Sequence, residues 1–387
     1  MSIFIKKIDT FKSGVFVLGN KYDLNKISNL LSHVKALYAS FDQIPILPRF
    51  AGRLEEELIK RSIFGTAALE GNPLTEDEVG KIVSKEYGNK ETQLKNPEIE
   101  IKNLKSAYQV IKNFPVSIDR CIDIDEEAIK NIHKIITLDI VDEDNLPGTY
   151  RNHKVFVGDK AHGGVYIPPK ILDDVKNIME QFVLWVNSDA IKQEDPLIRA
   201  ILVHYYLALI HPFGNGNGRT ARIAEAIMLK SSGIRYFASV MLSNYYYSNI
   251  DNYFSSFSLS ERNDNADITP FVEFCLQGMI VSCKELQERV YSGIRALALR
   301  DYYRLLKSDR KILQRQCELL LLLLQTGEQF TLSDLMKGDL FLAIYKDKGE
   351  RTVRRDIESL TVKNLIKQNK EGKYTLNIHV LDFSSSN

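Results

Sequence analysis

A segment of twelve residues that starts at His211 reads His-Pro-Phe-Gly-Asn-Gly-Asn-Gly-Arg-Thr-Ala-Arg. Gly216 and Gly218 can adopt positive φ, so that backbone N–H groups converge on an anion at a helix N-terminus. Arg219 and Arg222 are three residues apart, hence neighbours on one helical turn, where both guanidiniums can bind phosphates. His211 would lie beside the phosphate and take a proton from an incoming hydroxyl. The segment therefore predicts phosphoryl or nucleotidyl transfer.

Each of these features also has a purely structural explanation. A histidine in an apolar helix is more often a hydrogen-bonded core residue, as we expect for His204 on the preceding helix. A Gly-Asn-Gly turn is common between helices. The coincidence of imidazole, glycines and two arginines is what favours the chemical interpretation.

Helical patterns flank the segment on both sides. Asp195 can cap a helix that begins with Pro196, and apolar residues then recur at helical spacing as far as Leu209. The same spacing returns after Arg219. We therefore predict a tight turn between two helices, with His211 ending the first and Arg219 opening the second.

The segment resembles the signature of the Fic domain, which is His-Pro-Phe, any residue, Asp or Glu, Gly-Asn-Gly-Arg, two residues and Arg. The chain matches eight of the nine specified positions, and the departure is Asn215, where the family has its acidic residue. The likeness extends over roughly residues 60 to 280. Fic proteins mostly transfer AMP from ATP to a Ser, Thr or Tyr hydroxyl of a target protein and release pyrophosphate. The resemblance therefore implies a protein adenylyltransferase that uses ATP and Mg²⁺ and also modifies itself.

The resemblance implies roles for individual residues. His211 would be the general base, and Asn215 would stand at the position that holds Mg²⁺. Because an amide oxygen ligates Mg²⁺ without a negative charge, we expect weaker metal dependence or a higher Mg²⁺ requirement. The nucleotide-binding residues around the phosphates would be Gly216, Asn217, Gly218, Arg219 and Arg222.

The stretch Thr-Ala-Ala-Leu-Glu-Gly-Asn-Pro, which contains Glu70, reads as a helix end in which Gly71 supplies the cap and Pro73 prevents continuation. It also resembles the inhibitory helix of Fic proteins, which is Ser or Thr, three residues, Glu, then Gly or Asn. A Glu70 carboxylate paired with Arg222 would occupy the guanidinium that the γ-phosphate needs. We therefore expect Glu70 to inhibit the enzyme.

Two short strands are predicted at 155–158 and 163–167, around a turn rich in glycine. Without further context they would be an ordinary surface hairpin. In Fic domains the equivalent hairpin is a flap over the active site, and its edge pairs with an extended segment of the target. The resemblance thus implies that Val165 and Tyr166 belong to a target-docking flap.

The last 80 residues suggest a different class of function. Helices are predicted at 311–325, 331–336 and 350–363, followed by a hairpin at 365–376, and this order resembles a winged helix-turn-helix. Arginines at 351, 354 and 355 would start its recognition helix. Such domains bind DNA or dock proteins, so an alternative function is a DNA-binding regulator whose Fic core is a degenerate nucleotide sensor.

Length and composition fit a mainly α protein of several domains. The chain has 387 residues, 44% hydrophobic content and a formal net charge of +1, which argues against wholesale binding to nucleic acid or anionic membranes. Four cysteines without metal-ligand spacing are expected to be reduced core thiols. With neither a long apolar segment nor a signal peptide, we expect a cytoplasmic protein without membrane contact, and self-association stays open. The predicted divisions are an N-terminal helical region with the inhibitory helix at 1–100, a Fic core with its hairpin flap at 101–285, a connecting helix at 286–307 and the winged helix at 308–387.

Overall fold

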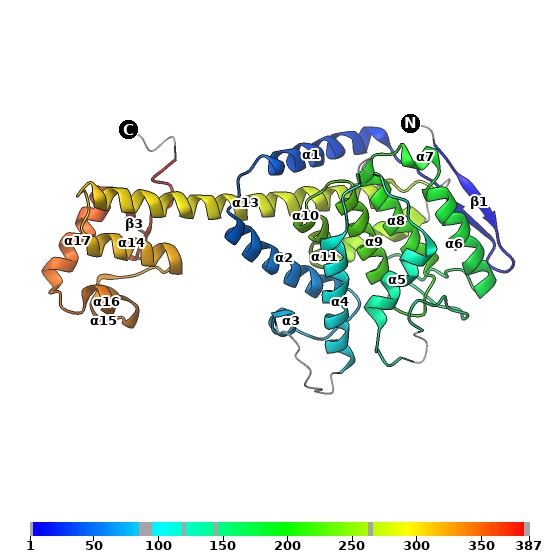
Figure 1. The fold of residues 1–387 in the computed structure, drawn as a ribbon, viewed down its shortest axis with the longest axis horizontal. Coiled ribbons are helices and arrows are strands. Elements are labelled where there is room, and N and C mark those ends of the chain that lie inside the picture. Colours follow the sequence, from blue (N-terminus) through cyan, green and yellow to red (C-terminus); the bar gives the residue numbers. More distant parts are fainter. Residues whose placement is uncertain (1–2, 85–94, 118–120, 143–145, 262–265, 383–387) are drawn as a thin grey trace. The chain divides into compact units, whose positions relative to one another are not determined.

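The computed structural model describes residues 3–84, 95–117, 121–142, 146–261 and 266–382, and it is mainly helical as predicted (Figure 1). The chain divides into two compact units, Met1–Leu286 and Gln287–Asn387. The four-part division drawn from the sequence stays a prediction. The first unit contains β1 (Lys6–Asp9), β2 (Val15–Leu18), α1 (Leu24–Asp42), α2 (Pro48–Ala68), α3 (Glu76–Ser84), α4 (Asn96–Asn113), α5 (Glu126–Thr137), α6 (Leu172–Val186), α7 (Asp189–Lys192), α8 (Pro196–Ile210), α9 (Asn217–Ser231), α10 (Tyr236–Val240), α11 (Leu242–Ser248), α12 (Ile250–Glu261) and the first part of α13 (Thr269–Ser308).

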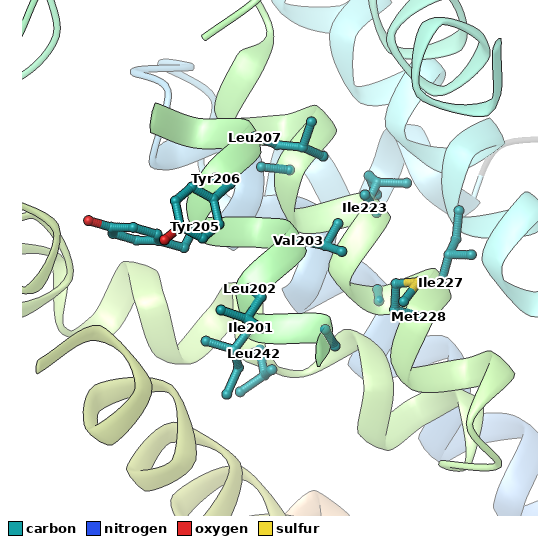
Figure 2. Packing of buried hydrophobic residues seen from close by; sticks show 14 of the residues in the cluster. Ile201, Leu202, Val203, Tyr205, Tyr206, Leu207, Ile223, Ile227, Met228 and Leu242 are labelled. Atoms are coloured by element: carbon teal, nitrogen blue, oxygen red, sulfur yellow. The ribbon is translucent and has the colours of Figure 1, made fainter. Parts of the chain in front are cut away.

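Helices α8 and α9 form the centre of the first unit. α8 is apolar on nearly all sides and is buried along most of its length, as expected for a helix in a protein core. Figure 2 shows Leu202 and Val203 of α8 in one apolar cluster with Ile223 and Met228 of α9 and with Leu242 of α11. Complete burial of an aliphatic side chain stabilises a fold by about 1.5–3 kcal/mol. These contacts therefore fix the two helices against each other and hold the turn between them.

The turn between α8 and α9 follows the prediction except at its end. α8 begins at Pro196 and the Asp195 carboxylate accepts a hydrogen bond from the Leu197 amide (3.0 Å). α9 begins at Asn217, two residues before the predicted start at Arg219. The Asn217 side chain both accepts from the backbone N–H of Phe213 (2.9 Å) and donates to its carbonyl (2.8 Å), which closes the turn early.

A hairpin lies near the N-terminus, where the sequence predicted only a helical region at 1–100. β1 and β2 pair antiparallel from Lys6 opposite Leu18 to Asp9 opposite Val15. The turn between them is stabilised by the buried Asp174 of α6, which is remote in sequence. Its carboxylate accepts hydrogen bonds from the backbone N–H groups of residues 11 and 12 and from the hydroxyl of residue 13.

The predicted strands at 155–158 and 163–167 are wrong in extent. The pairing is a single antiparallel bridge, in which Val157 and Tyr166 exchange backbone hydrogen bonds of 3.0 and 2.8 Å. Gly158 and Gly164 have φ of 85° and 103°, and this left-handed backbone ends the ladder on one side. The Pro168-Pro169 pair, which cannot donate to a ladder, follows on the other. The hairpin is therefore short, and we call residues 155–167 the flap.

The second unit combines the end of α13 with a small helical cluster. The predicted connecting segment 286–307 lies within α13 (Thr269–Ser308). The β3–β4 pair runs antiparallel from Ile366 opposite Leu376 to Gln368 opposite Tyr374, and Phe330 forms a bridge to Tyr374. The remaining elements are α14 (Gln314–Thr326), α15 (Leu332–Lys337), η1 (Asp339–Phe341), α16 (Leu342–Tyr345), α17 (Glu350–Val362), β3 (Ile366–Gln368) and β4 (Tyr374–Leu376).

The structure shows the state of the cysteines and the character of the helices. All four cysteines are free thiols, of which Cys121 is partly exposed and the others are buried. Within the described ranges, each helix is either too short or too polar to cross a bilayer.

Candidate active site

His211 follows the last residue of α8 in a left-handed backbone conformation, with φ 51° and ψ 57°. This conformation costs a non-glycine residue about 1–3 kcal/mol and persists where its surroundings enforce it. Here the guanidinium of Arg151 donates from Nε to the His211 carbonyl (2.7 Å), and the Arg151 backbone N–H donates to the carbonyl of Pro212 (3.0 Å). The segment just before the flap therefore fixes the backbone of the predicted base.

Within the described part of the chain, only Nδ1 of the His211 ring has a hydrogen-bond partner. Nδ1 lies 3.2 Å from the carbonyl oxygen of Ala208, and because a carbonyl only accepts, Nδ1 carries the proton. Burial lowers the pKa of His211 to about 4; the positive charge of Arg151 also lowers it, while the bond to Ala208 and the charge of Glu70 oppose the shift. The imidazole is therefore neutral at pH 7, and Nε2 is free to accept a proton.

A cavity of about 210 Å³ lies beside this histidine. It is enclosed by the end of α8, the start of α9, the flap and the aromatic face of α12. The residues from these elements and from the end of α2 that line it include His211, Gly218, Arg222, Glu70, Tyr166 and Phe257.

Arg222 lines the cavity and is held by the end of α2. Its Nη2 lies 2.7 Å from Oε1 of Glu70, and its Nε and Nη2 donate to the hydroxyl (2.8 Å) and the carbonyl (3.1 Å) of Thr66. The ion pair anticipated between Glu70 and Arg222 is thus present. On the other side, Nη1 donates to the hydroxyl of Tyr253 (3.4 Å).

Charge stabilises Glu70 in its ionised form. Burial alone would raise the pKa of its carboxyl, but Arg222 and Arg219 together outweigh burial and hold the pKa below its usual value. A Cβ on Gly218 would collide with Oε1 of Glu70, so the carboxylate lies directly against the glycine-rich helix start. Glu70 therefore takes the place at which an anionic ligand would meet Gly218 and Arg222.

Arg219 has different partners from Arg222, although the sequence suggested that both face the phosphates. Its Nη1 lies 2.8 Å from Oε1 of Glu100 on α4, and its Nη2 donates to Oδ1 of Asn215 (2.9 Å). Arg219 is 3% exposed and is not among the residues that line the cavity. Burial raises the pKa of Glu100, against the opposing charge of Arg219.

Asn215 lies next to a carboxylate that is remote in sequence. Its Nδ2 donates to Oδ2 of Asp142 (2.9 Å), and its Oδ1 accepts from the Gly216 N–H (2.6 Å) as well as from Arg219. Among the residues that the structure describes, no group of three or more His, Cys, Asp or Glu side chains could hold a metal. The amide of Asn215 and the carboxylate of Asp142 nonetheless lie beside each other at the turn.

The flap is tied to α12 beside the cavity. His162 lies 3.0 Å from Asp159 within the flap and 3.0 Å from Asp251 of α12, and Ser258 donates to its carbonyl (2.6 Å). Tyr166 and Val165 both line the cavity, and Val165 is also 55% exposed. The two flap residues singled out from the sequence thus both border the cavity.

Three groups that the sequence analysis did not single out complete the site. Glu100, His133 and Asp142 come from α4, α5 and the segment after α5, and each lies at least 73 residues before the motif residue that it contacts. Burial lowers the pKa of His133 to about 4. No local pattern marks such residues, because only tertiary packing brings them to the turn.

His204 is a buried core residue, as predicted. It lies 2.9 Å from the Tyr253 hydroxyl and 3.0 Å from the Glu225 carboxylate, and it is fully buried. Because the Tyr253 hydroxyl also contacts Arg222, the hydrogen bonds of His204 and Tyr253 help to hold the Arg222 side chain.

Comparison with known proteins identifies the domain that carries the site. Residues 123–229 match the Fic/DOC family. Protein adenylyltransferase fic-1 of Caenorhabditis elegans is 24% identical over 245 residues, covering 59% of this chain and 42% of that protein. Protein adenylyltransferase Fic of Drosophila melanogaster is 28% identical over 239 residues, covering 60% and 42%. The chain therefore spans about two fifths of the length of these curated relatives.

Solved structures show the same fold. A Fic family protein from Desulfovibrio desulfuricans G20 superimposes with a TM-score of 0.55 at 19% identity, covering 92% of this chain and 97% of the other. Fic-1 (residues 134–508) from C. elegans gives a TM-score of 0.51 at 21% identity, covering 69% and 73%. The matched residues 123–229 contain both arginines and His211.

Proposed function

We propose that this Fic-domain protein transfers AMP from ATP to a hydroxyl side chain of a target protein. The observation that carries the proposal is the neutral His211, whose free Nε2 borders the same cavity as Arg222 and the glycine-rich start of α9. The relatives named protein adenylyltransferases support this activity over the alternative of a DNA-binding regulator with a degenerate nucleotide-sensing core.

The reaction follows from these positions. The target hydroxyl oxygen attacks the α-phosphorus of ATP, a new O–P bond forms, and the bond between the α-phosphorus and the bridging oxygen breaks, so that pyrophosphate leaves. His211 accepts the hydroxyl proton. The backbone N–H groups of Asn217 and Gly218 and the charge of Arg222 stabilise the phosphate oxygens, and the Gly216 N–H would join them once it leaves Oδ1 of Asn215. Arg219 would join them only after it leaves Glu100.

Intact-mass spectrometry tests the proposed activity directly. The protein is incubated with ATP and Mg²⁺, alone and with candidate target proteins, and the masses are compared with those after incubation with GTP, CTP or UTP. A mass increase equal to one AMP supports the proposal. An increase by another nucleotide would identify a different transferred group, and no covalent increase on any protein would refute transfer.

Mg²⁺ would be held by the side-chain oxygens of Asn215 and Asp142 together with the phosphates. Carboxylate, amide and phosphate oxygens are the ligands that this cation prefers. When bound, Mg²⁺ neutralises part of the charge on the phosphates. The two side chains already lie in contact, although through Nδ2 of Asn215, so the amide would have to turn to bring Oδ1 to a cation beside Asp142.

Replacement of Asn215 by aspartate should lower the Mg²⁺ concentration needed for half-maximal ATP binding by about tenfold. The substitution brings a second carboxylate against Asp142, and two facing carboxylates repel each other until a cation binds between them. The measurement is ATP affinity by calorimetry across a Mg²⁺ titration. Asn25→Asp, at an exposed position on α1, is the matched control. If the Mg²⁺ concentration for half-maximal ATP binding were unchanged, residue 215 would not be a metal ligand.

We further propose that Glu70 inhibits the enzyme through Arg222 and that the flap docks the target. The ion pair and the collision expected at Gly218 support the first role. For the second, an extended target segment would pair with the edge of the flap at Val165 and Tyr166 and present its hydroxyl to His211. A cytoplasmic location and self-association stay predictions from the sequence.

We infer that the second unit is a winged helix-turn-helix that contacts DNA. The order of α14, α15, α17 and the β3–β4 hairpin supports this interpretation, as does the bridge that adds Phe330 to the hairpin. α17 buries Val353 and Leu360 and leaves Arg351 and Arg355 exposed, one turn apart. Exposed arginines at the start of a recognition helix are placed for phosphate contacts.

Replacement of Arg351 and Arg355 together by alanine should weaken DNA binding and reduce its dependence on salt. Each lost phosphate contact lowers the slope of log affinity against log salt concentration by about 1. The measurement is fluorescence anisotropy with a mixed-sequence duplex at several salt concentrations. Arg49→Ala with Arg53→Ala, an exposed pair at the same spacing on α2, is the matched control. Equal slopes for both double variants and the unchanged protein would exclude this surface.

A further inference from the structure

His133 of α5 links the glycine-rich turn to the segment that precedes the flap. Its Nε2 lies 2.9 Å from the carbonyl oxygen of Asn215, and its Nδ1 accepts a hydrogen bond of 2.9 Å from the backbone N–H of Gly148. The ring also stacks on Phe213, with 3.7 Å between the ring centres and 2° between the planes. The side chain is fully buried. A single residue thus contacts three parts of the site.

These hydrogen bonds determine which nitrogen carries the proton. A backbone N–H can only donate, so Nδ1 of His133 is an acceptor and the ring is neutral with its proton on Nε2. Nε2 therefore donates to the carbonyl of Asn215. The opposite tautomer would lose both bonds.

The bond to Asn215 also orients the amide of Gly216. The carbonyl of residue 215 and the N–H of residue 216 belong to one planar peptide unit, so fixing one fixes the other. Gly216 has φ 74° and precedes the first turn of α9. Without a partner for the carbonyl, this glycine-containing peptide could rotate and carry the anion-binding amides with it.

We propose that His133 is a positioning residue for AMP transfer, which holds the Asn215–Gly216 peptide and the Gly148 amide in the arrangement that the phosphates require. This inference rests on the proposed function, because it assigns His133 to the same reaction. Arg151 holds the other end of the turn through the carbonyl of His211. The turn is consequently supported at both ends by side chains from outside the motif.

Packing alone does not account for this arrangement. A leucine or phenylalanine could fill the space against Phe213, but it would leave the carbonyl of Asn215 and the N–H of Gly148 without their partner. Burial of a polar group without a hydrogen bond is unfavourable, so the peptides would turn to find new partners. The functional consequence would be a displaced turn in a folded protein.

Three substitutions separate the contributions of His133. In His133→Gln, the side-chain amide can still donate to Asn215. In His133→Asn, the shorter side chain can still accept from Gly148 but does not reach Asn215. His133→Phe keeps the stacked ring and removes both bonds. Ile136→Val, a conservative change at a buried position of the same helix, is the control for packing.

We expect kcat for AMP transfer to fall about 100-fold in His133→Phe and His133→Asn, with a smaller change in KM for ATP, because a displacement of about 1 Å at a reacting centre has an effect of this size. His133→Gln should retain most of the activity, and Ile136→Val all of it. Melting temperatures are measured for every variant. If His133→Phe does not fold, the kcat values of His133→Gln and His133→Asn are compared to test the proposal.

Hydrogen exchange provides a readout that does not depend on turnover. Amides of residues 211–218 should exchange faster in His133→Phe and His133→Asn than in His133→Gln or the unchanged protein. If the unchanged protein transfers no AMP, the proposed function fails while the exchange data still test His133. Equal exchange and equal kcat in all variants, or a Gln variant as impaired as the Phe variant, would overturn the proposal.

Discussion

Replacement of His211 by alanine is expected to lower the rate of AMP transfer by about 10²–10⁴-fold, the usual contribution of a general base. The hydroxyl proton would lose its imidazole acceptor at the cavity, because Nε2 of His211 is the unprotonated ring nitrogen. ATP binding should change little, since Gly218 and Arg222 are untouched. The measurement is the initial rate of AMP incorporation together with the ATP dissociation constant.

The pH dependence should identify the same group. The pKa of His211 is about 4 rather than the usual ~6.5, so the basic form prevails at all higher pH values. As the pH falls, kcat/KM, which reports the free enzyme, should stay level through pH 6 and decline only near pH 4. An acidic limb near pH 6.5 would contradict this assignment.

His33→Ala is the matched control for His211→Ala, because His33 is an exposed histidine on α1. This control should leave both the rate and ATP binding unchanged. If His211→Ala retained the full rate, the proton would have another acceptor and the proposed mechanism would be wrong.

Replacement of Glu70 by glycine is expected to raise AMP transfer by about 5- to 150-fold, the range that a coupling free energy of 1–3 kcal/mol produces. In the unchanged protein the γ-phosphate must displace a carboxylate that lies 2.7 Å from Arg222 and against Gly218. Removal of this carboxylate leaves Arg222 bound to Thr66 and Tyr253, hence still in place for ATP. The ATP dissociation constant should fall together with the rise in rate.

Two further variants make the Glu70 experiment specific. Glu70→Gln keeps the size of the side chain but removes its charge, so it should also raise the rate. Asp77→Asn, at an exposed carboxylate on α3, should have no effect. Turnover in Glu70→Gly that equals that of the unchanged protein would exclude inhibition by this residue.

The sequence predicts which residues meet at the turn between α8 and α9, because these residues lie close together in the chain. His211, the glycines and Arg222 lie within twelve residues, and their helical flanks determine the turn between them. The Glu70 pairing was also anticipated, although this residue is 152 positions from Arg222. That success came from the family resemblance rather than from spacing, since nothing local indicates which arginine a distant carboxylate meets.

The errors have physical causes that the sequence does not display. The flap contains the β-branched residues that predict strands, yet left-handed glycines restrict pairing to Val157 and Tyr166. The N-terminal hairpin depends on Asp174, which is more than 160 residues from the turn that it holds. Arg219 was expected beside Arg222, but a carboxylate from α4 holds its guanidinium.

The lowered pKa of Glu70 determines which signals can release it from Arg222. Paired with Arg222, the carboxyl has a pKa below its ordinary ~4.5, and once displaced by ATP it would return toward that value. At a pH between these two pKa values, displacement by ATP would be accompanied by protonation of Glu70. At neutral pH the Glu70 carboxylate is ionised both when paired and when displaced, so it exchanges no proton. Between pH 6 and 8 the ionisation of Glu70 would therefore not change, so Glu70 itself would not make its displacement by ATP depend on pH. If Glu70 inhibits as proposed, its release from Arg222 would depend on nucleotide concentration or on movement of α2.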